Sequence, residues 1–177
     1  EDPNAKDMRD DAMELISASA RKLVDHLSFA RVAFGSAAGS DSFDSGELEK
    51  LTQGVYAHVR AELDWAVAPT SLPKSVSRAL INLAQLAAGA LPLGGVARAE
   101  LSEANGAYLV ALRAQGQRAR LHAEVADGLA GRPLGEGLGG RWVQAYYVHA
   151  IVAAKGGSVS AEAAAEDLVT LSAVIPA

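Results

Sequence analysis

The hydrophobic pattern at the start of the chain predicts a single long helix over residues 3–34. Its apolar side chains recur at alternating steps of three and four residues, and they are Met13, Ile16, Ala20, Leu23, Leu27, Ala30 and Phe34. This spacing is the heptad seam of a helix that packs lengthwise against another helix. We expect Asp2 to cap the helix at its start and Gly35 to end it in the left-handed conformation.

The length of this helix indicates that it has a partner. With about 1.5 Å of rise per residue, it would extend roughly 48 Å, more than a compact domain of this size covers. The partner helix is expected either earlier in the native chain or in a second subunit. A loop rich in glycine, serine and aspartate follows, so we divide the chain into a dimerisation segment over residues 1–38 and a globular domain over residues 45–177.

Helical and strand patterns alternate in the globular domain. We expect one helix to be capped by Asp44 and to run to about Val59, and a second to be capped by Ser71. Asn105-Gly106 between two alternating runs predicts a tight β-hairpin. The other predicted segments are strands over 63–67, 96–102, 107–115, 158–161 and 168–174, and helices over 73–88, 123–129 and 141–155. The predicted fold class is α+β, a long helix followed by a two-layer α/β sandwich with an antiparallel sheet.

The composition limits the classes of function. The chain has 177 residues, half of them apolar, and 21 acidic against 16 basic side chains. The net charge of −5 argues against general binding to nucleic acid or to an anionic membrane surface. The absence of cysteine excludes disulfides and thiolate sites. No long apolar run and no signal pattern occurs, so we expect a cytoplasmic protein, although a chain that starts at Glu1 leaves a removed leader open.

The four histidines do not form a metal motif. His26, His58, His122 and His149 lie far apart in the sequence, and none stands beside a compact carboxylate cluster. Neither a phosphate-binding P-loop nor the Gly-x-Ser-x-Gly nucleophile motif occurs. The glycines of GEGLGG at residues 135–140 could bring backbone amides to a phosphate, but such clusters more often form ordinary loops. We therefore expect no metal site and no cofactor.

His26 has the most suggestive position of the four histidines. It precedes Leu27 at the edge of the seam and is expected to be partly exposed. A histidine that receives a phosphoryl group from an aspartyl phosphate needs such a position, because a receiver domain must reach its ring nitrogen in line. The simpler interpretation is that His26 covers the edge of the seam. The residues alone favour the simpler interpretation and leave the other open.

Two segments resemble the ATP-binding domain of histidine kinases, the Bergerat fold. Residues 79–101, ALINLAQLAAGALPLGGVARAEL, look like its N-box helix, loop and following strand. Residues 135–176 are similar to its last glycine box, helix, Gly-Gly turn and closing hairpin. The order and spacing of the two segments match, so the resemblance covers the chain from residue 45 onward. It implies a two-layer α/β sandwich of the histidine kinase ATPase type.

The departures from the kinase pattern argue against kinase activity. Asn82 falls on the first asparagine of the N box, but Leu86 stands where the kinases have the asparagine that helps to hold Mg²⁺ and phosphates. An aliphatic side chain cannot coordinate a hard cation. The box that recognises adenine is also degenerate, because the stretch from Asp127 to Gly131, DGLAG, keeps the aspartate and loses the glycine pattern. The resemblance therefore implies a domain that does not bind ATP.

A helical hairpin followed by a degenerate kinase-type domain is the layout of the ChpT-like histidine phosphotransferases. Residues 16–39 resemble the second hairpin helix of that family, with FAR at 29–31 and AFG at 33–35 in its Phe-Ala-Arg and Ala-Phe-Gly pattern. The resemblance implies a homodimer in which two hairpins form a four-helix bundle. It also implies docking of receiver domains, from response regulators or a hybrid histidine kinase, and phosphoryl transfer between their aspartates through one histidine without ATP.

The family pattern implies where the functional residues lie. The phosphoaccepting histidine is expected on the first hairpin helix, before Glu1, and His26 does not align with it, which leaves His26 as a fallback. A face for receiver docking is expected around Arg21, Phe29 and Arg31. Two other functions stay open: a non-catalytic dimeric scaffold that binds response regulators, and an ATP-binding histidine kinase core.

Overall fold

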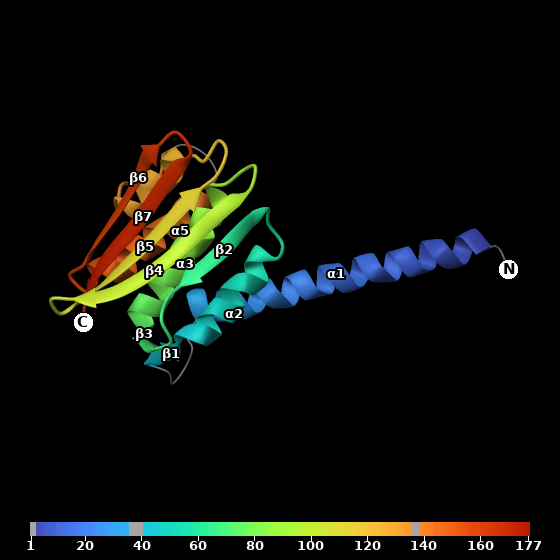
Figure 1. Ribbon diagram of the computed structural model, residues 1–177, viewed down its shortest axis with the longest axis horizontal. Helices are drawn as coiled ribbons and strands as arrows, with labels where there is room; N and C mark the ends of the chain where they lie inside the picture. The colour runs from blue at the N-terminus through green and yellow to red at the C-terminus, as the bar shows by residue number, and fades with distance from the viewer. Residues whose placement is uncertain (1–2, 36–40, 136–138) are drawn as a thin grey trace.

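The computed structural model describes residues 3–35, 41–135 and 139–177. Helix α1, Pro3–Ala33, projects from the globular part as an arm (Figure 1). The other elements follow in the order β1 Ser42–Asp44, α2 Ser45–Tyr56, β2 Ala61–Ala66, β3 Ser71–Pro73, α3 Lys74–Gly89, β4 Gly95–Ala104, β5 Ala107–Gln115, α4 Ala123–Leu129, α5 Gly140–Ala153, β6 Ser158–Ala165 and β7 Leu168–Pro176. The Asp2 cap and residues 136–138 of the glycine loop lie outside the described residues.

The globular part consists of one sheet with helices packed on one face. The strand order is β2-β4-β5-β7-β6, and α3 and α5 lie behind the sheet in the view of Figure 1. In β7 every second side chain is buried against these helices, namely Val169, Leu171, Ala173 and Ile175. Alternation of this kind is what a strand shows when one face meets the core and the other meets water. The predicted two-layer sandwich is confirmed.

The sheet differs from the prediction at its β2 edge. The predicted antiparallel pairing is confirmed for β4, β5, β7 and β6, whereas β2 pairs with β4 in parallel, which the sequence did not predict. The physical reason is the crossover: α3 lies between β2 and β4 in the chain and returns it to the same end of the sheet. The predicted hairpin between β4 and β5 is confirmed. Asn105 and Gly106 have φ values of 54° and 71°, as a type I′ turn requires.

The predicted ends of α2 and the predicted start of α3 agree with the structure only in part. The Asp44 cap of α2 is confirmed, because its Oδ1 accepts the amides of Gly46 and Glu47 at 2.9 and 3.1 Å. That helix ends at Tyr56, so Val59 does not belong to it. The predicted Ser71 cap is wrong. Ser71 lies in β3, a three-residue strand that pairs with β1, and α3 begins after Pro73 without a side-chain cap.

Gly35 ends the long helix for a different reason than expected. The backbone φ angle of Gly35 is not positive, so the predicted left-handed conformation is wrong. Its amide bonds to the carbonyl of Ala30 at 3.2 Å, and a Cβ at this position would lie 2.3 Å from the carbonyl oxygen of Arg31. Glycine is required because the backbone closes tightly on the last helical turn, where a side chain would collide with it.

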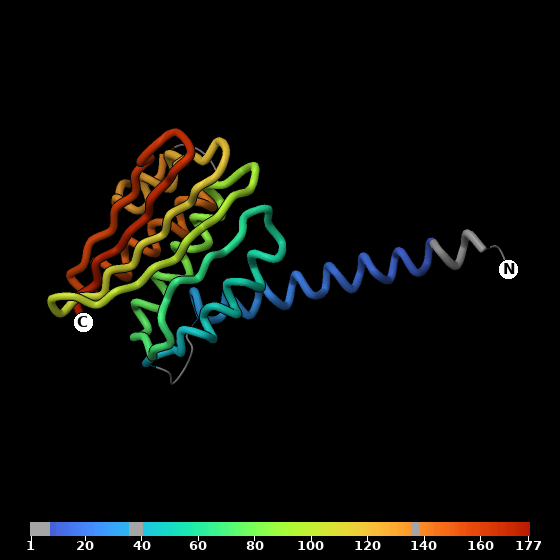
Figure 2. Tube along the Cα trace, viewed as in Figure 1, coloured from blue at the N-terminus to red at the C-terminus, as the bar shows by residue number. Residues whose placement is uncertain are grey.

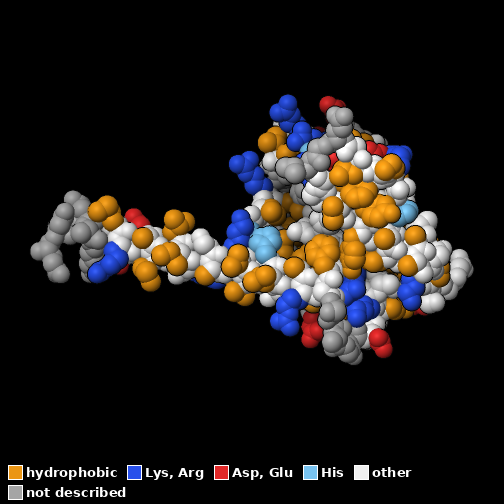
Figure 3. All heavy atoms as spheres, turned by 180° about the vertical axis from the view of Figure 1, so that it is seen from behind, with side chains coloured by type: hydrophobic (Ala, Val, Ile, Leu, Met, Phe, Trp, Pro, Cys, Tyr) orange, Lys and Arg blue, Asp and Glu red, His pale blue; other side chains and the backbone are white. Residues whose placement is uncertain are grey.

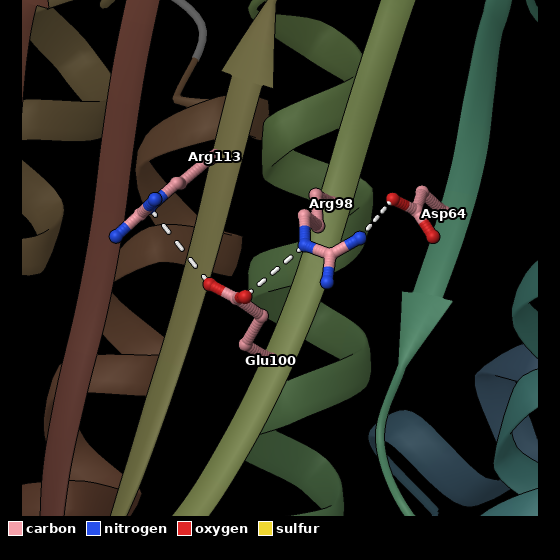
Figure 4. Close-up of polar contacts among 4 residues, drawn as sticks. All are labelled: Asp64, Arg98, Glu100 and Arg113. Atoms are coloured by element: carbon pink, nitrogen blue, oxygen red, sulfur yellow. Dashed lines mark hydrogen bonds and ion pairs between the residues drawn. The ribbon is translucent and has the colours of Figure 1, made fainter.

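The outer face of the sheet carries a chain of ion pairs (Figure 4). Arg98 on β4 pairs with Asp64 on β2 and, at 3.1 Å from its Nε, with Glu100 on its own strand. Glu100 also faces Arg113 on β5 at 3.8 Å. Asp64 and Arg98 are direct partners in the parallel register, so opposite charges stand side by side across the β2 edge. This pairing favours the observed register over one shifted by a residue.

Tyr56 links α2 to α3 inside the core. Its hydroxyl donates to the carbonyl of Ala84 at 2.6 Å, and burial raises the pKa of the phenol far above its usual range. The folded protein therefore keeps Tyr56 protonated at a pH where the unfolded chain ionises it. We expect the free energy of unfolding to fall by about 1.4 kcal/mol per pH unit above about pH 10.

Urea unfolding of the protein and of Tyr56→Phe, followed as a function of pH through that range, tests this expectation. The variant loses the hydrogen bond at neutral pH but has no phenol to ionise at this position, so its curve should be flatter at alkaline pH. Equal slopes for the two proteins would show that Tyr56 is not the group responsible.

Candidate functional site

Helix α1 presents two different faces near its C-terminal end. Phe29 is 2% exposed and Ala33 is fully buried, and both join the core of the globular part. The seam lies on other sides of the helix and is open: Met13, Ile16, Leu23 and Leu27 are 58–64% exposed. Figure 2 shows the arm extending away from the domain, which it contacts through α2 and α3. The space-filling view in Figure 3 shows hydrophobic side chains exposed along the arm.

The structure separates the three residues predicted to meet a receiver domain. Arg21 and Arg31 are exposed on α1. The expectation that Phe29 belongs to an exposed face is wrong, because its side chain is packed into the core. Its spacing from Ala33 is one helical turn, and the two side chains together form the contact through which the arm is held on the domain.

Side chains of α3 close the C-terminal end of α1. The guanidinium of Arg78 donates through Nε to the carbonyl of Val32 at 3.2 Å and through Nη2 to the carbonyl of Gly35. A helix of this kind leaves its last carbonyl groups without helical partners, and a cation near them is favourable. The arm is therefore attached by polar bonds as well as by the buried Phe29.

A second contact at the base of the arm brings two of the four histidines together. The carboxylate of Asp25 lies 2.7 Å from Nε2 of His58, and the ring of His58 stacks on the ring of His26 with centroids 6.0 Å apart. His26 is thus half-buried and has another ring beside it. The sequence did not predict this cluster, because Asp25 and His58 are 33 residues apart and meet only through the packing of α2 on α1.

Asn82, the asparagine that falls on the kinase N box, is fully buried and fully engaged. Its Nδ2 donates to the carbonyl of Arg78 at 2.9 Å and reaches the carbonyl of Ala33 at 3.4 Å. Its Oδ1 accepts from Gln144 of α5 at 3.1 Å. The amide therefore connects α1, α3 and α5. Its oxygen is buried and already accepts the bond from Gln144, so it is not open to a metal ion from solvent.

Leu86 lies one turn further along α3 and lines a cavity of about 80 Å³. The cavity lies between α3, α5 and the segment after β5, which contributes Arg120, Leu121 and His122. Pockets that hold ligands of drug or nucleotide size are typically about 300–1,000 Å³. The aliphatic Leu86 and the small volume both argue against a bound nucleotide with its magnesium ion.

The stretch assigned to the adenine box lies elsewhere. Asp127 is on α4, and its Oδ1 is 2.6 Å from Nη2 of Arg132 at the surface. Asp127 is not among the residues that line the cavity, and the assignment of this stretch to the adenine box stays a prediction. The segment that does line the cavity carries no acidic residue that a motif search could have found.

Within residues 3–35, 41–135 and 139–177, no group of three or more histidine, aspartate or glutamate side chains is placed to hold a metal ion. Of the helices that the structure describes, none is both long and apolar enough to cross a membrane.

Comparison with known proteins supports one family. The model of the histidine phosphotransferase C-terminal domain matches residues 45–167. The protein phosphotransferase ChpT of Brucella abortus (strain 2308) is 30% identical over 163 residues, which are 90% of this chain and 77% of that protein. The solved structure of a bacterial phosphotransferase has a TM-score of 0.82 at 28% identity, covering 93% of this chain and 79% of that one.

Histidine kinases share the fold at lower similarity. The mycobacterial sensor histidine kinase MprB has a TM-score of 0.58 at 19% identity, covering 76% of this chain and 95% of that one. This match confirms the kinase-type α/β fold and nothing further. Because the family model covers more than half of the sequence, the chain belongs to the histidine phosphotransferase family, and the predicted resemblance to ChpT-like proteins is confirmed.

Proposed function

We propose that this protein is the histidine phosphotransferase of a bacterial phosphorelay, which passes phosphoryl groups between receiver-domain aspartates without binding ATP. Membership of the family and the similarity to a protein phosphotransferase support the reaction class. The observation that carries the proposal is the state of the former N box. Asn82 is used as a structural link and Leu86 offers no ligand, so phosphate has to come from another protein.

The phosphoaccepting histidine is proposed to lie on a helix that packs against the open seam of α1. We place this helix before Glu1 and treat residues 1–38 as the second helix of the hairpin. The exposed Leu23 and Leu27 support this arrangement, since an apolar seam of this length is usually covered by another helix. Two hairpins would then form the four-helix bundle of a homodimer, with the domain over residues 45–177 at its side.

His26 is the weaker candidate for the phosphoacceptor. Its ring lies against His58, which is itself held by Asp25, so one side of the imidazole is covered. In-line attack on an aspartyl phosphate requires open approach to a ring nitrogen. The simpler role for His26, as part of the junction between α1 and α2, is the one this geometry supports.

Receiver domains of response regulators or of a hybrid kinase are the proposed partners, in the cytoplasm. Arg21 and Arg31 are exposed on the arm and could meet the acidic residues that surround a phosphorylated aspartate. Phe29 contributes to this surface indirectly. Its buried side chain fixes the end of α1, which includes Arg31, against the domain. Positioning is most of what such a transfer demands of the protein, so no second catalytic group is needed.

A phosphotransfer assay tests this function. A phosphorylated receiver domain is mixed with three proteins: one extended upstream of Glu1, the same protein with His26→Ala, and the chain over residues 1–177 alone. We expect phosphate to appear on both extended proteins and not on the chain alone. The readout is acid-labile, base-stable label on the protein, which distinguishes phosphohistidine from an aspartyl phosphate.

Each other outcome selects a different function. Label on the chain alone that is lost with His26→Ala would make His26 the phosphoacceptor. No label on any of the three, together with retained binding to the receiver, would favour a dimeric scaffold. Saturable binding of ATP and magnesium in calorimetry would contradict the proposal that the domain has lost its nucleotide site.

A further inference from the structure

The cavity beside Leu86 has an unusual set of polar groups at its edge. Its polar lining consists of Gln85, Arg120, His122, Arg141 and Gln144, with no aspartate or glutamate among the lining residues. The apolar part of the wall includes Leu121, Val125 and Leu171. In a chain with a net charge of −5, a cavity whose only charged lining residues among those described are two arginines is a local reversal of sign.

Among the residues that the structure describes, neither Arg120 nor Arg141 makes a side-chain hydrogen bond or an ion pair. Gln144 donates to Gln85 Oε1 at 2.6 Å and to Asn82, which leaves the Gln85 amide nitrogen as a further donor at the edge. The lining therefore has an excess of donors over acceptors.

The pKa of His122 is lowered by burial, and partly because the guanidinium groups of Arg141 and Arg120 lie near its ring. Glu124 and a hydrogen bond to the backbone of Gly89 act in the opposite direction but do not outweigh them. Arg120 and Arg141 are both exposed and line the same cavity, so an anion from solvent can reach the two guanidinium groups together.

We propose that this cavity binds a small organic anion, a carboxylate or phosphate that carries a compact apolar group. The oxyanion would accept from the guanidinium groups of Arg120 and Arg141, while the apolar group would contact Leu86 and Leu121. Arg141 stands in the first turn of the 14-residue helix α5, so the positive end of that helix adds to the attraction. The cavity of about 80 Å³ restricts the ligand to a size well below a nucleotide.

This inference goes beyond the phosphotransferase function, since the transfer between a histidine and a receiver aspartate makes no use of the cavity. It assigns a ligand site to a region whose former Mg²⁺-binding position is now Leu86.

A heteronuclear NMR titration of the whole chain tests the proposal. The probes are inorganic phosphate, butyl phosphate and butyrate, which separate the contribution of the phosphate, of the carboxylate and of the apolar group. We expect saturable shifts confined to residues that line the cavity, with butyl phosphate or butyrate binding more tightly than inorganic phosphate. Bound anion should also raise the pKa of His122, measured on its ring protons, because it stabilises the imidazolium.

Matched variants make the test specific. The double substitution Arg120→Gln and Arg141→Gln removes both charges and should weaken binding by at least about tenfold, because charge-assisted bonds to the oxyanion are lost. Arg9→Gln, which removes one exposed arginine from the arm, should leave the affinity unchanged. Arg141→Lys keeps the charge and should retain part of the binding. Phosphotransfer should be unaffected by all of these variants, so the two proposals fail separately.

Two results would overturn the anion site. One is the absence of any saturable shift at millimolar concentrations of all three probes. The other is equal binding to the protein and to the double variant, with Arg9→Gln also equal, which would identify the interaction as general attraction to surface charge. An unchanged His122 pKa at saturation would place the anion elsewhere and would count equally against the cavity.

Discussion

Leu23→Asp is expected to convert the proposed homodimer into a monomer while the globular domain stays folded. Leu23 is 64% exposed on α1 and belongs to the seam that we propose to be buried in a four-helix bundle. Placing a carboxylate there puts one unpaired charge from each subunit into an apolar interior, which is strongly unfavourable. We expect the dissociation constant of the dimer to rise by at least about a hundredfold.

Light scattering across a range of concentrations measures this effect, and circular dichroism checks the fold. Ala18→Asp is the matched control: it adds the same charge to the same exposed arm, but Ala18 lies between the seam positions and off their line. Its dimer should persist. A dimer that survives Leu23→Asp, or one that both substitutions abolish equally, would show that the seam is not the interface.

Asn82→Asp is expected to cause the largest loss of stability among conservative substitutions in this chain. The side chains have nearly the same shape, but the carboxylate has no hydrogen to donate to the carbonyl groups of Arg78 and Ala33. A buried negative charge would then face two carbonyl oxygens. We expect the free energy of unfolding to fall by about 3 kcal/mol or more, since both an unmade bond and an unpaired buried charge contribute.

Chemical denaturation measures the loss, and Gln85→Glu is the control. It makes the same change from amide to carboxylate nearly one turn further along α3, where the side chain is half-buried and accepts a bond from Gln144. A carboxylate can still accept that bond, so the change should cost less than about 1 kcal/mol. If Asn82→Asp were as mild as Gln85→Glu, Asn82 would not be the structural link between α1, α3 and α5.

The hydrogen bonds of Asn82 support the proposal that this kinase-type fold works without a nucleotide. The sheet and the helices behind it are retained, while the asparagine of the N box joins the domain to its helical arm. A domain of this kind would provide docking area and would orient the receiver domain. Positioning of the reacting groups is expected to supply most of the rate enhancement of the transfer.

The sequence by itself determined the elements whose cause is local. The seam of α1 follows from apolar spacing, the β4–β5 turn from Asn105-Gly106, and the α2 cap from Asp44, because each depends on neighbouring residues and on backbone conformations that they favour. The family resemblance was likewise readable, since it rests on the order of such segments along the chain.

Only the tertiary structure decided which residues meet across long distances in the chain. The sequence contains an apolar Phe29 but does not say what covers it. The structure shows that the globular domain buries this side chain. It is also silent on the parallel pairing of β2, which depends on the path of α3, and on the pairing of Asp25 with His58. The arginines around the cavity come from separate elements, so their shared field exists only once α3 and α5 are packed on the sheet.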